Sequence, residues 1–258
     1  MIKERKVLDH GYVKLTHKMI DQNEEEAQRQ SLDQMAVAAA RVSYGGDLKG
    51  EEKDKRLLHY LIEHEHGTPL ESAVVRLEVR LPIFVMRQWI RHRWASYNEI
   101  SGRYTEEIAD EYYTPTAFRG QDTKNKQGST TTDFGDAPTT TFPWKDQVND
   151  SHPDYDTAYT VREMWELEHN QQKRTYDNMI KAGVAKEIAR GILSTSFYTK
   201  FVWTINARSL MNFLILRCDS HAQWETRQYA WAIHDIMKEE MPWLIEGLEK
   251  YFPQSFIK

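Results

Sequence analysis

The segment between residues 87 and 104, RQWIRHRWASYNEISGRY, concentrates the residue types that could do chemistry in this sequence. It contains four arginines, a histidine, a glutamate and two serines, interleaved with two tryptophans and two tyrosines. Guanidinium groups hold phosphates and carbonyls through paired hydrogen bonds, and aromatic rings pack against planar ligands. We interpret the segment as part of a pocket for a planar, phosphorylated ligand. The alternative is a solvated basic helix whose aromatic side chains pack inward.

The spacing within this segment indicates how its polar groups are presented. Pro82 suits the first turn of a helix, and the apolar residues of 83–90 supply its buried side. On such a helix Gln88 and Arg91 lie three residues apart, and Arg87 and Arg91 lie four apart. The polar ends of these side chains could therefore converge on one anion.

After Ser96 the spacing changes to that of a strand or an extended loop. Glu99, Ser101 and Arg103 alternate with less polar residues, which predicts an acceptor, a hydroxyl and a cation on one edge. Ser101 could be a nucleophile only beside a positioned base, and no such base is evident from the sequence. Binding a phosphate or a pyrimidine is the simpler role for this hydroxyl.

The spacing of Arg91, His92, Arg93 and, after seven further residues, Ser101 resembles the RHR-x7-S signature of the flavin-dependent thymidylate synthases. The surrounding QWIRHR and SYNEISGRY are also similar to that family. The similarity resumes at residues 189–190 and through NARSLMNFLILRCDSHAQWE, so it spans about residues 66 to 243 apart from a variable middle. The resemblance implies an α+β fold, with a central antiparallel sheet flanked by helices, and an enzyme that methylates dUMP to dTMP.

The resemblance also implies the ligands and the assembly. The cofactor would be FAD, the reductant NADPH and the one-carbon donor 5,10-methylenetetrahydrofolate. The family forms homotetramers whose active sites are shared between subunits, so we expect small-molecule partners and a second copy of the chain, and neither nucleic acid nor membrane. No Rossmann-type G-x-G-x-x-G motif occurs in the sequence to indicate a dinucleotide site independently.

Site residues follow from the resemblance position by position. Contacts to dUMP are expected from Gln88, Arg91, Glu99, Ser101, Gly102, Arg103, Arg190 and Arg217. Contacts to FAD are expected from His66, Thr68, Arg91, His92, Arg93, Glu99, Asn206, Arg208, Asn212 and His221. The folate is expected to approach His66 as well. Ser194 and Thr195 depart from the family, in which a proline is frequent near this turn.

Arg217 is the residue to which the resemblance gives the catalytic role. A uracil ring becomes nucleophilic at C5 either when a cysteine thiolate adds to C6 or when the ring is polarised towards its anion. An arginine suits the second route because it stays charged and offers forked donors to a carbonyl and the adjacent nitrogen. Cys218 is the only cysteine, and no Pro-Cys loop surrounds it, so we interpret it as a small buried residue.

Two histidines, His64 and His66, stand two residues apart and could suggest a metal site. A metal needs more ligands, and neither an H-E-x-x-H motif nor a cysteine cluster supplies them. We therefore predict no metal; a metal hydrolase built on these histidines is a competing hypothesis. Another is a nucleic-acid binder that uses the arginine-rich segment as a stacking platform, against which the net charge of −5 and the pI of about 6.1 weigh.

The remaining periodicity predicts the elements that must position these groups within one domain spanning residues 1–258. Strands are expected at 7–15 and 75–81. Helices are expected at 24–43, 47–65, 159–182, 184–193, 206–216 and 229–241, and a capping tail at 242–258. Residues 114–156 form a loop-rich insertion, with a substrate-covering lid as the alternative. The N-terminus has no signal-peptide core, and no run of about 18 apolar residues occurs, so we expect a cytoplasmic location.

Overall fold

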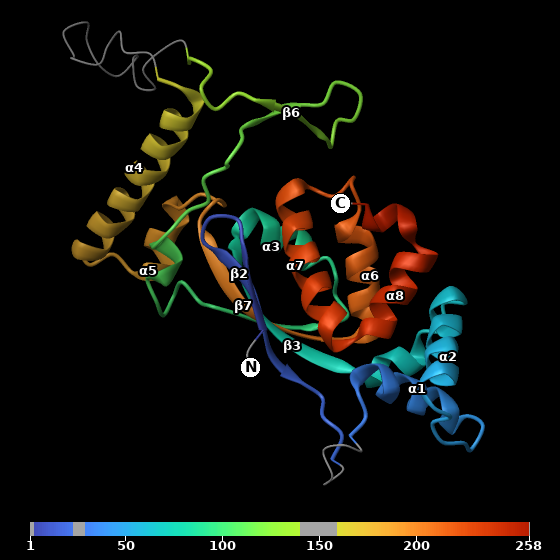
Figure 1. Ribbon diagram of the computed structural model, residues 1–258. Helices are drawn as coiled ribbons and strands as arrows, with labels where there is room; N and C mark the ends of the chain where they lie inside the picture. The colour runs from blue at the N-terminus through green and yellow to red at the C-terminus, as the bar shows by residue number, and fades with distance from the viewer. Residues whose placement is uncertain (1–2, 23–28, 140–158, 258) are drawn as a thin grey trace, which may run out of the picture. The chain divides into compact units, whose positions relative to one another are not determined.

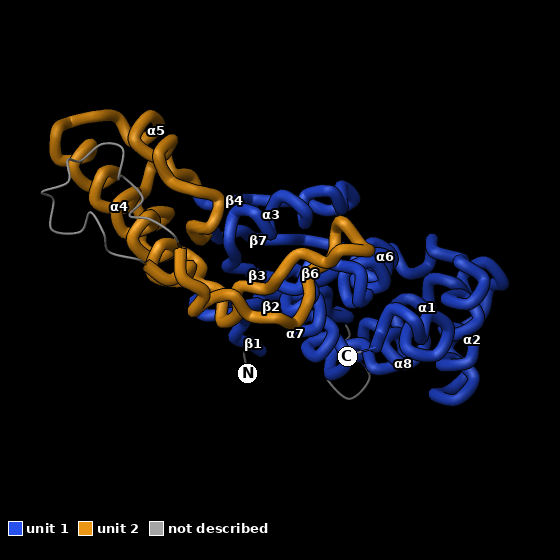
Figure 2. Tube along the Cα trace, turned by 90° about the horizontal axis from the view of Figure 1, so that it is seen from above, with its two compact units in different colours: residues 1–100, 199–258 blue, residues 101–198 orange. Residues whose placement is uncertain are grey.

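A computed structural model of the chain describes residues 3–22, 29–139 and 159–257 (Figure 1). Its contacts define two compact units, residues 1–100 with 199–258 and residues 101–198 (Figure 2). The predicted α+β class is confirmed, because a mainly antiparallel sheet is flanked by helices. The single domain over 1–258 stays a prediction. No helix among the described residues is long and apolar enough to cross a membrane.

The first unit is built on a five-stranded sheet with the strand order β1-β2-β3-β7-β4. Its strands are β1 (Lys3–Val7), β2 (Gly11–Lys18), β3 (Val74–Pro82), β4 (Ser96–Glu99) and β7 (Tyr198–Asn206). The pairs β1 with β2, β2 with β3, and β4 with β7 are antiparallel. Alternate residues of β3 are fully buried, as the predicted strand at 75–81 requires. The prediction omits β7, although its alternating Phe201, Trp203 and Ile205 carry the same signal.

The predicted strand at 7–15 is confirmed over 11–15, within β2, but wrong at 8–10, where the chain turns. Leu8 adopts a φ of +57°, and Val7 pairs with Gly11 to close a hairpin. A Cβ at Gly11 would overlap the Tyr229 hydroxyl of a packed helix and lie 2.7 Å from the Val7 carbonyl oxygen. A glycine at that position therefore lets the hairpin approach the helical layer.

Helices cover the buried face of this sheet (Figure 1). The helical layer contains α3 (Ile83–Trp89), α6 (Ala207–Cys218), α7 (Trp224–Glu240) and α8 (Pro242–Tyr251), with a short 3-10 turn at η6 (Pro253–Phe256). Beside it, α1 (Leu32–Val42) packs on the 3-10 turn η2 (Thr68–Ser72), and α2 (Glu51–Glu63) packs on α8. α7 packs on β1 and β2, and α6 packs on α7. The core includes Trp89, Trp203 and Phe213, whose rings meet with centroids 4.6–5.1 Å apart.

Two predicted boundaries in this unit need correction. The helix predicted to begin at residue 24 begins at Leu32, because Ser31 and Gln34 form a capping box there; residues 23–28 lie outside the described part. The predicted capping tail contains helix α8, whose first N–H groups need a partner. The buried Asp33 carboxylate accepts hydrogen bonds from Trp243 N (2.8 Å) and Leu244 N (3.2 Å). Burial raises the pKa of Asp33 to about 7, although these two donors lower it.

The second unit has a much smaller core. It contains β5 (Arg119–Gln121), β6 (Ser129–Asp133), η3 (Glu107–Ala109), α4 (Val161–Lys181), α5 (Lys186–Ala189) and η5 (Arg190–Ile192). Ala109, Tyr176 and Ala189 form its buried cluster. The predicted helix at 159–182 is confirmed, with a capping box at Thr160 and a φ of +87° at Gly183 where α4 stops. The helix predicted at 184–193 is α-helical only in α5, and Arg190 lies in the 3-10 turn that follows.

The predicted loop-rich insertion at 114–156 is partly structured. β5 and β6 pair as a two-stranded antiparallel ribbon within it. Asp133 Oδ1 accepts hydrogen bonds from Phe118 N (2.7 Å) and Gly135 N (2.8 Å), which fixes the base of the ribbon. Threonine favours β-strands, but the β6 sequence STTTD has no alternation of apolar and polar residues. The hydrophobic periodicity therefore does not predict this strand. Residues 140–156 of the insertion lie outside the described residues.

Candidate active site

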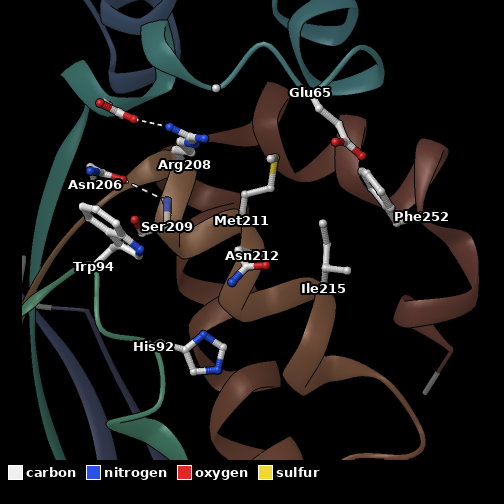
Figure 3. A pocket seen from close by; sticks show the side chains of 12 residues that line it. Glu65, His92, Trp94, Asn206, Arg208, Ser209, Met211, Asn212, Ile215 and Phe252 are labelled. Atoms are coloured by element: carbon white, nitrogen blue, oxygen red, sulfur yellow. Dashed lines mark hydrogen bonds and ion pairs between the residues drawn. The ribbon is translucent and has the colours of Figure 1, made fainter.

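A cavity of about 610 Å³ lies within the first unit (Figure 3). Loop, 3-10 and helix residues from four parts of the unit surround it. Its lining residues are Glu65, Gly67, Glu71, His92, Trp94, Asn206, Arg208, Ser209, Met211, Asn212, Ile215 and Phe252. The volume falls in the range of small-molecule and cofactor pockets. Four of the residues expected at FAD, namely His92, Asn206, Arg208 and Asn212, are brought together here.

Helix α6 supplies one wall of this cavity, and its sequence explains how. Asn206 is the N-cap, because its side-chain oxygen accepts a hydrogen bond from Ser209 N at 2.9 Å. Arg208 and Asn212 follow four residues apart on the exposed side, while Leu210, Phe213 and Leu214 are buried on the other. The predicted helix at 206–216 is confirmed, and it also extends to Cys218, which is fully buried as predicted.

Arg208, at the N-terminal end of α6, is held by Gly67 and by Glu71 of the 3-10 turn η2. Its Nη1 donates to the Glu71 carboxylate in an ion pair. Gly67 lies against the stem of this arginine, where an added Cβ would be 2.6 Å from Arg208 Cδ. Neither Gly67 nor Glu71 is among the site residues predicted from the sequence. The signal that could have indicated Glu71 is its position three residues after Thr68, a predicted FAD residue.

Arg217 lies at the opposite end of α6, in a partly buried environment. Its Nε donates to His92 Nε2 at 2.9 Å, and its Nη2 lies 3.4 Å from the Gln88 backbone oxygen. Burial, with the Arg217 charge as a smaller cause, lowers the pKa of His92 to about 4, so the imidazole is neutral at pH 7. Burial also lowers the pKa of Arg217, which remains charged.

The Gln88 side chain is fixed by residues at the start of α7. Its Nε2 donates to Gln223 Oε1, and Thr226 Oγ1 donates to its Oε1 at 3.5 Å. Gln223 Nε2 in turn donates to the buried Glu225 at 2.9 Å. The amide of Gln88 therefore has a defined orientation. The sequence does not predict Gln223 and Thr226 as site residues, because they lie more than a hundred residues from Gln88 in the chain.

The helix predicted to carry Arg91 is shorter than expected. α3 ends at Trp89, so the three- and four-residue spacings to Arg91 do not place its polar group beside those of Gln88 and Arg87. The Tyr97 hydroxyl shares its hydrogen between the carbonyls of Trp89 (3.3 Å) and His92 (2.7 Å), and His92 N donates to the Trp89 carbonyl at 3.0 Å in the turn that follows α3. Arg91 and its neighbour Arg93 are both exposed and do not line the cavity.

Of the polar edge predicted for Glu99, Ser101 and Arg103, only Glu99 lies in a strand. Glu99 closes β4 and accepts a hydrogen bond from Thr199 Oγ1 at 2.6 Å. In the second unit the chain then turns, and Ser101 Oγ accepts from Arg103 N at 3.3 Å. The strand spacing fails because a turn, not β structure, follows Ile100.

That turn brings together the dUMP residues predicted for the second unit. Arg103 Nε donates to Glu187 at 3.1 Å. Gly102 is buried, and an added Cβ would lie 3.1 Å from Arg190 Cδ. Ser194 donates its N–H to Gln172 at 2.8 Å, a hydrogen bond that a proline at this position could not make.

Three further residues predicted at FAD lie outside the cavity lining. His66 and Thr68 flank Gly67 and are exposed. The His66 ring lies 5.9 Å from that of Tyr60. His221 is exposed in the turn after α6, where its Nδ1 lies 2.8 Å from Asp219. Within 3–22, 29–139 and 159–257, no cluster of three or more His, Cys, Asp or Glu could hold a metal; the absence of a metal stays a prediction.

Comparisons with known proteins identify the family. The model described as "Thymidylate synthase complementing protein" matches residues 26–243. A flavin-dependent thymidylate synthase of Thermosipho africanus is 42% identical over 248 residues, covering 96% of this chain and 95% of its own. One from Thermotoga neapolitana is 43% identical over 245 residues, covering 95% and 94%.

A solved structure is similar over the same length. The UMP/dUMP methylase PolB from Streptomyces cacaoi, bound with 5-Br dUMP, has a TM-score of 0.71 and 26% sequence identity, and the match covers 97% of this chain and 100% of PolB. The sequence similarity extends over nearly the whole chain, including the segments around Arg91 and Arg217. The chain therefore belongs to the flavin-dependent thymidylate synthase family.

Proposed function

We propose that this enzyme converts dUMP to dTMP by reductive methylation, with 5,10-methylenetetrahydrofolate as the one-carbon donor and NADPH as the source of reducing equivalents. When bound, FAD supplies the hydride that reduces the transferred carbon to a methyl group. The names of the relatives support the reaction, and the 5-Br dUMP bound to PolB supports the substrate. The protein's own task is to bind, orient and polarise the reactants.

The observation that carries this proposal is the set of partners around Arg217. Both of its hydrogen-bond partners in the described residues, His92 and the Gln88 carbonyl, are neutral at pH 7. The guanidinium charge is therefore not compensated by a carboxylate, and the fork keeps donors for a ligand. An uncompensated, partly buried cation stabilises an anion that develops beside it.

This arrangement supports activation of the pyrimidine without a thiolate. Donors from Arg217 to the uracil carbonyl and N3 favour the ring anion and so raise the electron density at C5. Cys218 follows Arg217 directly in sequence but is fully buried, so its sulfur is a packing group. We propose Arg217 as the catalytic residue on this basis.

The cavity residues fit a dinucleotide. Amide groups of Asn206 and Asn212, the Arg208 guanidinium and the His92 ring provide donors and acceptors, and Met211, Ile215 and Phe252 provide apolar surface. We propose that the FAD site includes these four polar residues. His66, Thr68, Arg91, Arg93, Glu99 and His221 complete the proposed FAD set from outside the cavity lining.

From the resemblance to the family, we propose a set of residues that hold the phosphate and the pyrimidine of dUMP. The proposed set is Gln88, Arg91, Glu99, Ser101, Gly102, Arg103, Arg190 and Arg217. Arg91, Arg103 and Arg190 are exposed cations, as an incoming phosphate requires. We also propose a homotetramer with shared active sites, because exposed site residues suit completion by a second copy. We further propose a cytoplasmic location and no nucleic-acid partner.

The test begins with the absorption spectrum of the purified protein after incubation with FAD and removal of free flavin. We expect retained flavin bands that shift when dUMP is added, and dTMP formation that requires both NADPH and the folate. A folded protein that retains no flavin and forms no dTMP would overturn the proposal. For the assembly, we expect Arg190→Ala and Arg217→Ala subunits to recover part of the activity when mixed, and no recovery would contradict shared sites.

A further inference from the structure

The contact between His92 and Arg217 assigns a role to the histidine that goes beyond the flavin contact expected of it. We propose that His92 is a positioning residue: its Nε2 holds Arg217 Nε, its proton resides on Nδ1, and this contact sets the orientation of the guanidinium fork. The proposal rests on the proposed function of Arg217. It concerns a side chain that otherwise only lines the cavity.

The direction of this hydrogen bond follows from the chemistry of the two groups. Arginine Nε always carries a hydrogen and has no lone pair to offer. At 2.9 Å the histidine nitrogen must therefore be the acceptor, which leaves Nε2 without a proton. A neutral ring then carries its hydrogen on Nδ1. A protonated ring would lose the acceptor and place a second positive charge against Arg217.

The surroundings of His92 hold the ring in place and keep it neutral. The Phe213 ring lies 4.9 Å away in an edge-on contact, and the Tyr97 hydroxyl donates to the His92 carbonyl oxygen at 2.7 Å. Burial raises the pKa of Tyr97 to about 12, so the tyrosine is uncharged. Arg217 is the charged group in contact with the ring. Across the cavity lining lie the carboxylates Glu65 and Glu71 and the cation Arg208.

The packing around His92 restricts the movement of the Arg217 side chain. Phe213 and Arg217 stand four residues apart on α6, so the helix that packs against the His92 ring also presents the arginine to it. Two donors of the fork are directed to His92 and to the Gln88 carbonyl, which removes rotational freedom from a long side chain. The remaining donors are thereby presented in one orientation. The same ring lines the cavity (Figure 3). Because it also accepts the Arg217 hydrogen bond, it connects the proposed flavin pocket with the arginine.

Nitrogen-15 solid-state NMR of the flavin-loaded protein, labelled at histidine, tests the tautomer directly. The His92 resonances are assigned as those missing from the His92→Gln variant. We expect a protonated Nδ1 and an unprotonated Nε2 at pH 7, and the same neutral ring at about pH 5.5, where an ordinary histidine is charged. A proton on Nε2, or a charged ring at that pH, would overturn the proposal whatever the activity of the enzyme.

A pair of variants then tests the consequence for turnover. His92→Gln keeps an acceptor near the Nε2 position, whereas His92→Leu keeps bulk and loses the acceptor. We expect His92→Leu to lower kcat by about 100-fold, as a misplaced catalytic group does, with the KM for dUMP within about threefold. We expect His92→Gln to recover at least about tenfold of that loss.

Equal kcat values in the two variants would contradict a positioning role. So would a loss confined to FAD affinity that saturating FAD restores. If His92→Leu does not fold, the NMR result on the unchanged protein still decides the matter. Failure of the unchanged enzyme to form dTMP would instead sink the proposed function, and the tautomer measurement separates the two outcomes.

Discussion

The two ends of helix α6 place arginines in opposite surroundings. Arg208, in the first turn, is exposed and paired with the Glu71 carboxylate. Arg217, in the last turn, is partly buried and contacts only neutral acceptors among the described residues. The favourable place for a cation on a helix is its C-terminal end, so the macrodipole opposes Arg208 and assists Arg217.

This difference separates two tasks. A neutralised, solvated arginine can position a ligand by hydrogen bonds while adding little field. An uncompensated, partly buried arginine stabilises charge that forms next to it. On the proposed function, we expect ligand binding at the start of α6 and chemistry at its end, so changes at the two ends should have different kinetic effects.

The largest effect is expected at the C-terminal end. Arg217→Lys keeps the positive charge but replaces the fork with a point donor, which cannot serve two acceptors at fixed geometry. We expect kcat to fall by about 100-fold or more, while the dissociation constants of dUMP and FAD change by less than about tenfold. Stopped-flow turnover and flavin-absorbance titrations measure these quantities. Turnover near that of the unchanged enzyme would remove Arg217 from the catalytic role.

A smaller effect is expected at the N-terminal end. In Gly67→Ala, the new methyl group would displace Arg208 and disturb its pair with Glu71, although the Gly67 φ of −76° suits alanine. We expect FAD affinity to weaken by about tenfold, with kcat restored at saturating FAD. The matched control is Gly46→Ala, where an added Cβ meets nothing within 4 Å. A Gly67→Ala variant that binds FAD normally would break the comparison.

The pH dependence of the free energy of unfolding should reveal the low pKa of His92, the neutral partner of Arg217. The folded-state pKa of His92 is about 4, and its ordinary value is 6.5. Between these values the unfolded chain binds more protons at this residue, so the free energy of unfolding decreases as the pH falls from 6.5 to about 4. Above 6.5 the residue contributes no pH dependence. We expect urea unfolding of His92→Gln to show a weaker acid dependence in this window, and identical profiles would contradict the low pKa.

The smallest effect is expected at Cys218, immediately after Arg217, the proposed catalytic arginine. Cys218→Ala removes a buried sulfur, which should cost about 1 kcal/mol of unfolding free energy. We expect kcat within about twofold of the unchanged enzyme, measured by dTMP formation below the unfolding transition. Complete loss of activity in a folded, assembled variant would restore the thiolate mechanism and assign the chemistry at this end of α6 to sulfur.

Whether a helix or strand could be predicted depends on how far apart in the sequence the residues that fix it lie. The strand at β3 and the helices α2, α4 and α6 follow from local periodicity and caps, because their partners lie within a few residues. The end of α3 could not be predicted, since no glycine or proline marks it in the sequence and the Tyr97 hydroxyl meets the Trp89 carbonyl there from across a loop. The hairpin at Leu8 likewise depends on the approach of Tyr229 to Gly11.

The amino-acid sequence by itself determined the family, the concentration of arginines around Arg91 and the chemical type of each candidate site residue. Tertiary structure alone decided which of these groups meet. His92 and Arg217 are 125 residues apart, and Arg208 and Glu71 are 137 apart. Neighbours and burial shift a pKa away from the ordinary value of its residue type and decide whether a charge is compensated, and local spacing indicates neither. The same residue, arginine, therefore becomes a neutralised contact at one end of α6 and an uncompensated cation at the other.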